Sequence, residues 1–207
     1  IVAEREVKGA AFSLAQVCGR LVAGIGSKVQ VFGMNSNKED ATSFTGQPEL
    51  QLEATHTSQI MALYLKVKGD NVLVGDLVRS LTLLRFKPQE RVLQEVARDL
   101  NSSYLRAVEI MNGAQEDVYL GTDINGNLQC MRQAADAVSD EERSRLECCG
   151  EFSLGEYLNA FSRGSLVGQP IESDSQGKNG GGGDAASSAG SVLSPNYTSI
   201  TGLKVGT

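Results

Sequence analysis

The sequence is poor in histidine, the residue that most often carries acid–base catalysis, because it holds only His56. We recognise no nucleophile paired with a base and no set of metal ligands in its motifs. Basic residues are also outnumbered, since 19 lysines and arginines stand against 25 acidic residues for a formal net charge of −6. Such a chain has no positive field that would attract a phosphate backbone. We therefore expect neither an enzyme nor a protein that binds nucleic acid through charge alone.

Zinc-type spacings and long apolar runs are absent as well. The four cysteines, Cys18, Cys130, Cys148 and Cys149, form no CxxC pair, so we expect no metal and no cofactor. The adjacent Cys148 and Cys149 are interpreted as free thiols and not as a redox device. Neither a leader nor an apolar run of membrane-spanning length is found, which predicts a soluble protein. The chain starts at Ile1 instead of methionine, so we expect a piece of a longer product.

The sequence does contain a threefold layout of strands and turns. In each copy an apolar strand precedes a turn, a second strand ends at glycine, and a tight turn leads to a third strand. The glycines Gly24, Gly75 and Gly121 are separated by 51 and 46 residues, near the period of a four-stranded propeller blade. The spacing predicts an all-β fold, a partial β-propeller with about three to four blades of four-stranded antiparallel sheet. A plain antiparallel sandwich is the alternative. The three copies cover residues 11–32, 61–84 and 107–131.

The turn residues agree with this layout. Gly69-Asp70-Asn71 and Asn125-Gly126 tolerate positive φ and are typical of hairpins. Asp123 and Asn127 beside Asn125 are reminiscent of a calcium loop, but the glutamate at the twelfth position is missing, so we predict a bare turn. Residues 24–28 lack the full spacing of a phosphate loop and a following helix, which favours a hairpin turn there too.

Beyond the three copies, a fourth unit is expected to begin at Phe152 and to run to Val167. Before it, Ser139 is followed three residues later by Glu142, a capping-box pattern that predicts one short helix in a loop. Glycine, serine and alanine then dominate, which is typical of disorder. The predicted domains are a partial β-propeller over 1–168, a Gly/Ser-rich disordered loop over 169–190, and a divergent final strand or tail over 191–207.

The remaining polar residues in and just before the second copy predict no further site. His56 lies in a polar stretch expected to connect two blades, so we interpret it as exposed and structural. The basic residues are spread over two strands and their turns and are not interleaved with aromatics, so we expect them to be solvated. These basic residues are Lys66, Lys68, Arg79 and Arg85.

The stretch from Ile60 to Ser80, which contains Met-Ala-Leu-Tyr-Leu and Val-Gly-Asp-Leu-Val-Arg-Ser, closely resembles the DNA damage-binding protein 1 family. Matching segments recur over nearly all of residues 5–168. The resemblance implies a much longer protein with three seven-bladed propellers and a helical C-terminal domain. This chain is similar to part of the third propeller.

The same resemblance implies a non-catalytic scaffold that works by binding proteins. Family members link WD-repeat substrate receptors to a cullin-4 RING E3 ubiquitin ligase, in DNA damage recognition, nucleotide excision repair and ubiquitin-dependent proteolysis. Damaged DNA would be contacted mainly through a partner subunit, and the implied location is the nucleus and also the cytoplasm. No membrane and no small-molecule substrate is expected among the partners.

In the family, receptors insert a short helical motif against an apolar and aromatic surface with one arginine. Tyrosine and arginine suit such a role, since they are common anchors of desolvated interfaces. Met61 and Leu63 alternate along a strand, so the core is an equal alternative for them, whereas burial is less natural for Arg79 and Ser80 near a hairpin turn. Tyr104 stands where a tryptophan is common, so partner preference is expected to differ. By resemblance, the partner-binding residues are Met61, Leu63, Tyr64, Leu77, Arg79, Ser80, Tyr104, Tyr157 and Asn159.

Two related scaffolds are the alternatives. One is the large subunit of the mRNA cleavage and polyadenylation factor, and the other is the corresponding splicing-factor subunit. Either would make the chain part of a nucleic-acid-binding subunit of RNA processing. The segment from Ile60 to Ser80 resembles the damage-binding family more closely than either.

Overall fold

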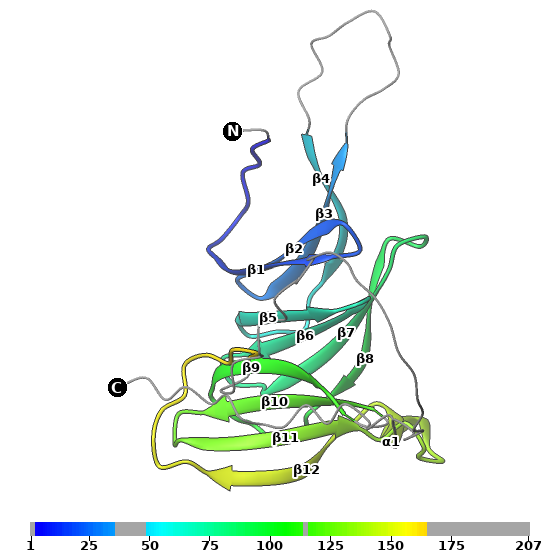
Figure 1. The fold of residues 1–207 in the computed structure, drawn as a ribbon. Helices are drawn as coiled ribbons and strands as arrows, with labels where there is room; N and C mark the ends of the chain where they lie inside the picture. Colours follow the sequence, from blue (N-terminus) through cyan, green and yellow to red (C-terminus); the bar gives the residue numbers. More distant parts are fainter. Residues whose placement is uncertain (1–2, 36–48, 114–115, 165–207) are drawn as a thin grey trace, which may run out of the picture. The chain divides into compact units, whose positions relative to one another are not determined.

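The computed structural model describes residues 3–35, 49–113 and 116–164, which contain three four-stranded antiparallel sheets (Figure 1). In each sheet, strands that follow one another in the sequence are hydrogen-bonded neighbours. The first sheet contains β1 (Ala11–Val17), β2 (Arg20–Ile25), β3 (Lys28–Asn35) and β4 (Glu49–His56). The second contains β5 (Ala62–Lys68), β6 (Asn71–Asp76), β7 (Leu81–Lys87) and β8 (Val92–Arg98). The third contains β9 (Leu105–Asn112), β10 (Asp117–Asp123), β11 (Asn127–Gln133) and β12 (Leu146–Ser153).

The second sheet is buried on both faces, because it shares one apolar core with the first sheet and another with the third. Val72 and Val74 of β6 belong to the core toward the first sheet, while Leu73 between them belongs to the core toward the third. Strands covered on both faces have few polar positions, and β6 and β7 are accordingly almost entirely buried. Leu81 and Leu83 of β7 likewise belong to the core toward the third sheet, and Leu84 and Phe86 belong to the core toward the first, because alternate residues of a strand point to opposite faces.

The repeated glycines lie at points where two sheets approach closely. A Cβ atom on Gly24 would lie 2.5 Å from the carbonyl oxygen of Ala62 in the second sheet, and one on Gly75 would lie 2.6 Å from Val108 Cγ1 in the third. Gly121 is less tightly enclosed, since its nearest neighbour would be Leu105 Cδ2 at 3.2 Å. The lack of a side chain at Gly24 and Gly75 therefore permits the close approach of neighbouring sheets.

Polar contacts also join neighbouring sheets. The Ala62 amide donates to the carbonyl of Gly26 (2.9 Å), which links the β2–β3 turn to the start of β5. Lys66 Nζ lies 2.7 Å from Glu109 Oε2, and Lys68 forms a second ion pair with Asp117. The expectation that these two lysines are merely solvated is therefore wrong. They bind carboxylates of the third sheet, although such partly exposed pairs contribute only about 1 kcal/mol or less.

The predicted short helix is confirmed as α1 (Asp140–Arg143), in the loop between β11 and β12. Ser139 is its N-cap, and its hydroxyl accepts a hydrogen bond from the Glu141 amide (3.2 Å). The predicted start of a fourth unit at Phe152 is wrong. Phe152 and Ser153 pair with β11 as the last residues of β12, so they complete the third sheet. No strand is found in the described residues after them.

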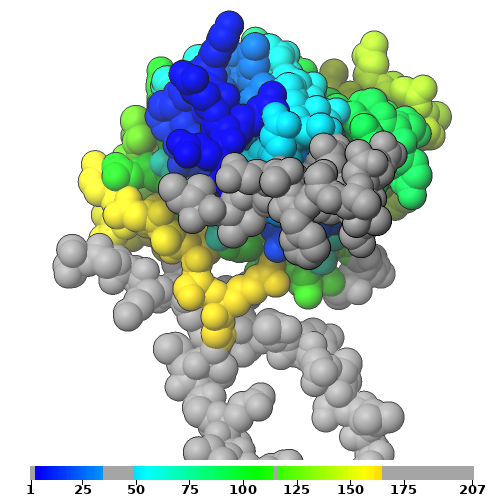
Figure 2. All heavy atoms as spheres, turned by 90° about the horizontal axis from the view of Figure 1, so that it is seen from above, coloured from blue at the N-terminus to red at the C-terminus, as the bar shows by residue number. Residues whose placement is uncertain are grey.

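The all-β prediction is confirmed, and the sandwich alternative is wrong because three sheets pack one after another through two cores. Residues up to Phe161 belong to one unit. Arg5 near the N-terminus donates to the carbonyl of Leu50 (2.6 Å). Figure 2 shows the dark blue N-terminal segment beside cyan atoms. Across the described ranges, no helix is long and apolar enough to cross a bilayer. The predicted end of the fourth unit, the loop over 169–190 and the tail over 191–207 lie outside the described residues.

Candidate protein-binding surface

A buried carboxylate fixes the loops at the end of the second sheet where β5 begins. Asp76, the last residue of β6, is fully buried and accepts four backbone hydrogen bonds. Its Oδ2 accepts from Ile60 (2.7 Å) and Met61 (3.0 Å). Its Oδ1 accepts from Val78 (2.9 Å) and Arg79 (3.0 Å). One side chain therefore holds the segment before β5 and the loop after β6 in a single conformation.

Arg79 projects from this loop and is exposed. Its Nη1 donates to the carbonyl of Ser58 (2.6 Å) in the β4–β5 connection. The loop is also held from the other side, because Ser103 in the connection to the third sheet donates its amide to Val78 O (3.1 Å). The guanidinium has five N–H donors, so donors remain for a partner.

A polar network lies behind Arg79. His56 Nε2 lies 2.7 Å from Ser58 Oγ and 3.3 Å from Glu95 Oε2, and Glu95 also binds Arg98. Burial lowers the pKa of His56, and the Glu95 carboxylate offsets this only in part. The expectation that His56 is exposed is wrong, since it ends β4 and only 15% of its side chain is exposed. Its role in this network is structural.

Four predicted apolar contacts lie at the start of β5 or just after β6 and are half-buried. Met61 precedes β5, and its carbonyl accepts the Leu77 amide (3.0 Å). Leu63 is the unpaired residue at a bulge of β5. Tyr64 packs against the core between the second and third sheets. Neither Met61 nor Leu63 belongs to a core cluster. The two therefore stay partly accessible beside Leu77.

Ser80, in contrast, is fully buried, contrary to the expectation that burial is unnatural there. Its carbonyl accepts the Asp76 amide (3.0 Å), and its backbone has a left-handed φ of 62°. This conformation turns the chain inward and places the serine beneath the loop. The Ser80 side chain is thus not part of the exposed surface.

Tyr104 lies just before β9, and 51% of it is exposed. Its carbonyl accepts the amide of Ile124 (3.0 Å), which ties it to the β10–β11 turn. That turn is organised by Asp123, whose Oδ1 accepts the amides of Asn125 (2.9 Å) and Asn127 (2.8 Å). The Asp123 carboxylate therefore binds amide groups of its own loop and fixes this turn.

Tyr157 and Asn159 lie in the segment after β12, and both are exposed. Arg106 of β9 joins them: its guanidinium lies 5.0 Å from the centre of the Tyr157 ring, and its Nε donates to Asn159 Oδ1 (3.2 Å). The segment is further held by Thr122, whose hydroxyl donates to the Leu158 carbonyl (3.1 Å). The sequence analysis missed Arg106, because the local sequence pattern does not indicate contacts between residues about 50 positions apart.

The predicted residues share the end of the sheets where β5 and β9 begin, since β6 and β10 end there. Large exposed apolar side chains occur in the loops at this same end. Sequence reasoning missed three of them, although hydrophobic residues inside otherwise polar loops were a usable signal. These three are Ile60 (49% exposed), Leu100 (60%) and Ile124 (45%).

The cysteines and the other potential metal ligands add no cluster to the described part of this surface. The four cysteines are free thiols. Among the residues the structure describes, no group of three or more histidine, cysteine, aspartate or glutamate side chains is arranged to hold a metal ion. The arrangement instead combines a rigid loop, an exposed arginine and exposed aromatics, which are the features of a protein-binding surface.

A family model described as CPSF A subunit region matches residues 1–190, which include all three sheets. The chain belongs to the CPSF A subunit family. It is 44% identical over 174 residues to DNA damage-binding protein 1 of Solanum lycopersicum, with 84% of this chain and 15% of that relative aligned. It is 41% identical over 167 residues to DNA damage-binding protein 1a of Arabidopsis thaliana, with 81% and 14% aligned.

The alignments with DNA damage-binding protein 1, together with the CPSF A subunit match, confirm the predicted resemblance. The rice protein (Oryza sativa subsp. japonica), also named DNA damage-binding protein 1, is 40% identical over 167 residues. The chain is thus a homologue of DNA damage-binding protein 1 that spans 15% or less of the length of these relatives. All predicted contacts fall within the part matched by the CPSF A subunit model.

Proposed function

We propose that this chain is part of a non-catalytic scaffold that links WD-repeat substrate receptors to a cullin-4 RING E3 ubiquitin ligase. The relatives reported above are named DNA damage-binding proteins. The proposed action is therefore in DNA damage recognition and ubiquitin-dependent proteolysis, in the nucleus and also the cytoplasm. Damaged DNA would reach the complex mainly through a partner subunit, in keeping with the chain's net negative charge.

The observation that carries this proposal is the loop built on Asp76. It presents Arg79 beside the half-buried Met61 and Leu77, and Tyr104 follows from the next connection. A pre-organised loop loses little conformational entropy on binding. An arginine and tyrosines surrounded by apolar side chains are the usual centre of a protein interface. This surface suits a short amphipathic segment of a receptor.

The test is reconstitution of the full-length protein with a purified WD-repeat receptor and cullin-4. We expect Arg79→Ala and Tyr104→Ala each to weaken receptor binding by about tenfold or more, as for interface hot spots. Cullin binding should not change. Its retention also shows that the variants are correctly folded. The matched controls are Arg85→Ala, an exposed arginine of β7, and Phe152→Ala, an exposed aromatic of β12. Receptor affinities equal to wild type in both test variants would contradict the proposal.

A further inference from the structure

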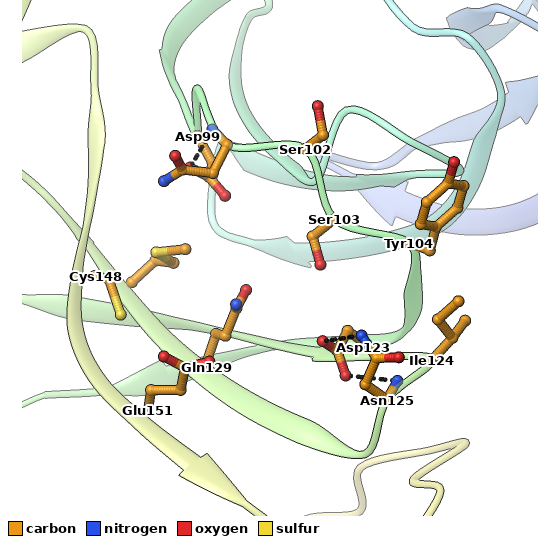
Figure 3. A pocket seen from close by; sticks show the side chains of 12 residues that line it. Asp99, Ser102, Ser103, Tyr104, Asp123, Ile124, Asn125, Gln129, Cys148 and Glu151 are labelled. Carbon is orange, nitrogen blue, oxygen red and sulfur yellow. Dashed lines mark hydrogen bonds between the residues drawn. The ribbon is translucent and has the colours of Figure 1, made fainter.

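A pocket of about 270 Å³ lies where the connection from β8 to β9 passes the third sheet. Figure 3 shows Asp99 and Ser102 on one side of the pocket and Gln129 and Glu151 on the other. Tyr104 and the Asp123 turn close a third side. The second and third sheets both lie within the described residues, so the walls of this pocket are present in the structure.

The pocket is acidic. Asp99, Asp123 and Glu151 line it, and none of the described residues that line it is a lysine, arginine or histidine. Burial alone would raise the pKa of Asp123, but hydrogen bonds from Asn127 and Asn125 outweigh burial and lower it. Asp123 is therefore ionised at neutral pH. The neighbouring Arg98 does not neutralise the pocket, since its Nε lies 2.5 Å from Glu95 Oε1.

A second, independent observation concerns the Asp99 carboxylate. Asp99 is only 4% exposed. Its Oδ1 accepts the Asn101 amide (2.9 Å), but its Oδ2 is buried without a hydrogen-bond partner among the described residues. A buried carboxylate oxygen without a donor is costly, because desolvation is not compensated. An N–H group of a ligand in the pocket would supply the missing hydrogen bond to this oxygen and so compensate for its desolvation.

The other walls suit the remaining parts of a small cationic group. The amide side chains of Asn101 and Gln129 offer carbonyl oxygens to further N–H groups. The ring of Tyr104 and the side chain of Ile124 form an apolar rim, where an alkyl stem or the face of a guanidinium packs well.

We propose that this pocket is a binding site for one guanidinium or primary ammonium group, held by the carboxylates of Asp99 and Glu151. The proposal rests on the residues of the pocket itself, although Tyr104 at its rim also belongs to the candidate receptor-binding surface. The group comes from one of two sources that share this chemistry: a free organic cation, or an arginine or lysine side chain of a bound protein. The volume of about 270 Å³ is large enough for such a group and a short alkyl stem.

The experiment titrates the full-length protein with agmatine, which carries a guanidinium and a primary ammonium, and follows binding by calorimetry. N-butylurea serves as the neutral probe. We expect saturable binding of agmatine and none of N-butylurea. Glu151→Gln should weaken agmatine binding about tenfold, because it removes a charged acceptor. Glu147→Gln, an exposed carboxylate of the same strand outside the pocket, should leave the affinity within about twofold of wild type.

Asp99→Asn supplies a second variant, since it keeps the size of the side chain while removing its charge. It should also weaken agmatine binding about tenfold, with its thermal unfolding recorded to confirm that it folds. Repeating the titration on a receptor-loaded complex separates the sources. Lost binding shows that the receptor fills or covers the pocket, which favours a receptor side chain as the source, and retained binding identifies a free cation. Absence of saturable agmatine binding to wild type, or equal weakening by Glu147→Gln and Glu151→Gln, would overturn the proposal.

Discussion

Replacing Asp76 with alanine is expected to lower the free energy of unfolding of the three-sheet region by about 4 kcal/mol. The carboxylate is fully buried and accepts hydrogen bonds from the amides of four residues. Alanine leaves these donors unsatisfied, and each buried orphan costs about 1–3 kcal/mol unless water reaches it. The loop that carries Arg79 should lose its fixed conformation first.

Amide hydrogen exchange of the full-length protein, followed by mass spectrometry, measures this effect. Peptides covering 58–62 and 76–80 should exchange faster by at least two orders of magnitude, the factor that about 3 kcal/mol gives. Asp70→Ala is the matched control, because this aspartate lies in the turn of the same sheet with 53% of its side chain exposed. Unchanged protection of the two peptides in the Asp76 variant would show that the carboxylate does not organise the loop.

Gly24→Ala is expected to separate the first sheet from the second and to destabilise the protein by about 3 kcal/mol, at the upper end for overpacking. The added Cβ would lie 2.5 Å from the carbonyl oxygen of Ala62. A backbone oxygen cannot rotate away as a side chain does. Relief therefore requires β2 and β5 to move apart, which opens the core that they share.

Gly150→Ala provides the comparison within the same protein. Gly150 also lies in a strand, but an added Cβ there would meet only Cys130 Cβ at an ordinary 3.8 Å. We expect a change of about 0.5 kcal/mol or less. Chemical unfolding of the two variants beside wild type measures both effects. Equal stabilities of the alanine variants would mean that the close contact at Gly24 is relieved without cost.

The strand framework follows from the sequence because local chemistry determines it. Alternating apolar residues and hairpin turns each constrain the chain over a few residues, the recurrence of Gly24 and Gly75 marks the repeat, and three sheets result. The start of the fourth unit was wrong for the same reason. Phe152 and Ser153 have the pattern of a strand, but only the pairing of β12 with β11 shows to which sheet they belong.

The surface depends more on contacts between distant residues, which the sequence does not display. Ser80 looks like a turn serine, yet the Asp76 hydrogen bonds and a left-handed backbone bury it. His56 is drawn into a network by Glu95, which lies on another sheet. Arg106 contacts Tyr157 from a strand about 50 residues earlier. Residue type suggested the exposed anchors, whereas burial and partners arose only from the packing of the sheets.

The most direct test of the central claim is a pull-down from nuclear extract with the full-length protein. Wild type is compared with the Arg79→Ala, Tyr104→Ala double variant, and bound proteins are identified by mass spectrometry. The scaffold proposal predicts that wild type recovers a cullin and WD-repeat receptors, and that the double variant loses the receptors but keeps the cullin. Recovery of polyadenylation or splicing subunits without any cullin would contradict it and would assign the chain to RNA processing instead.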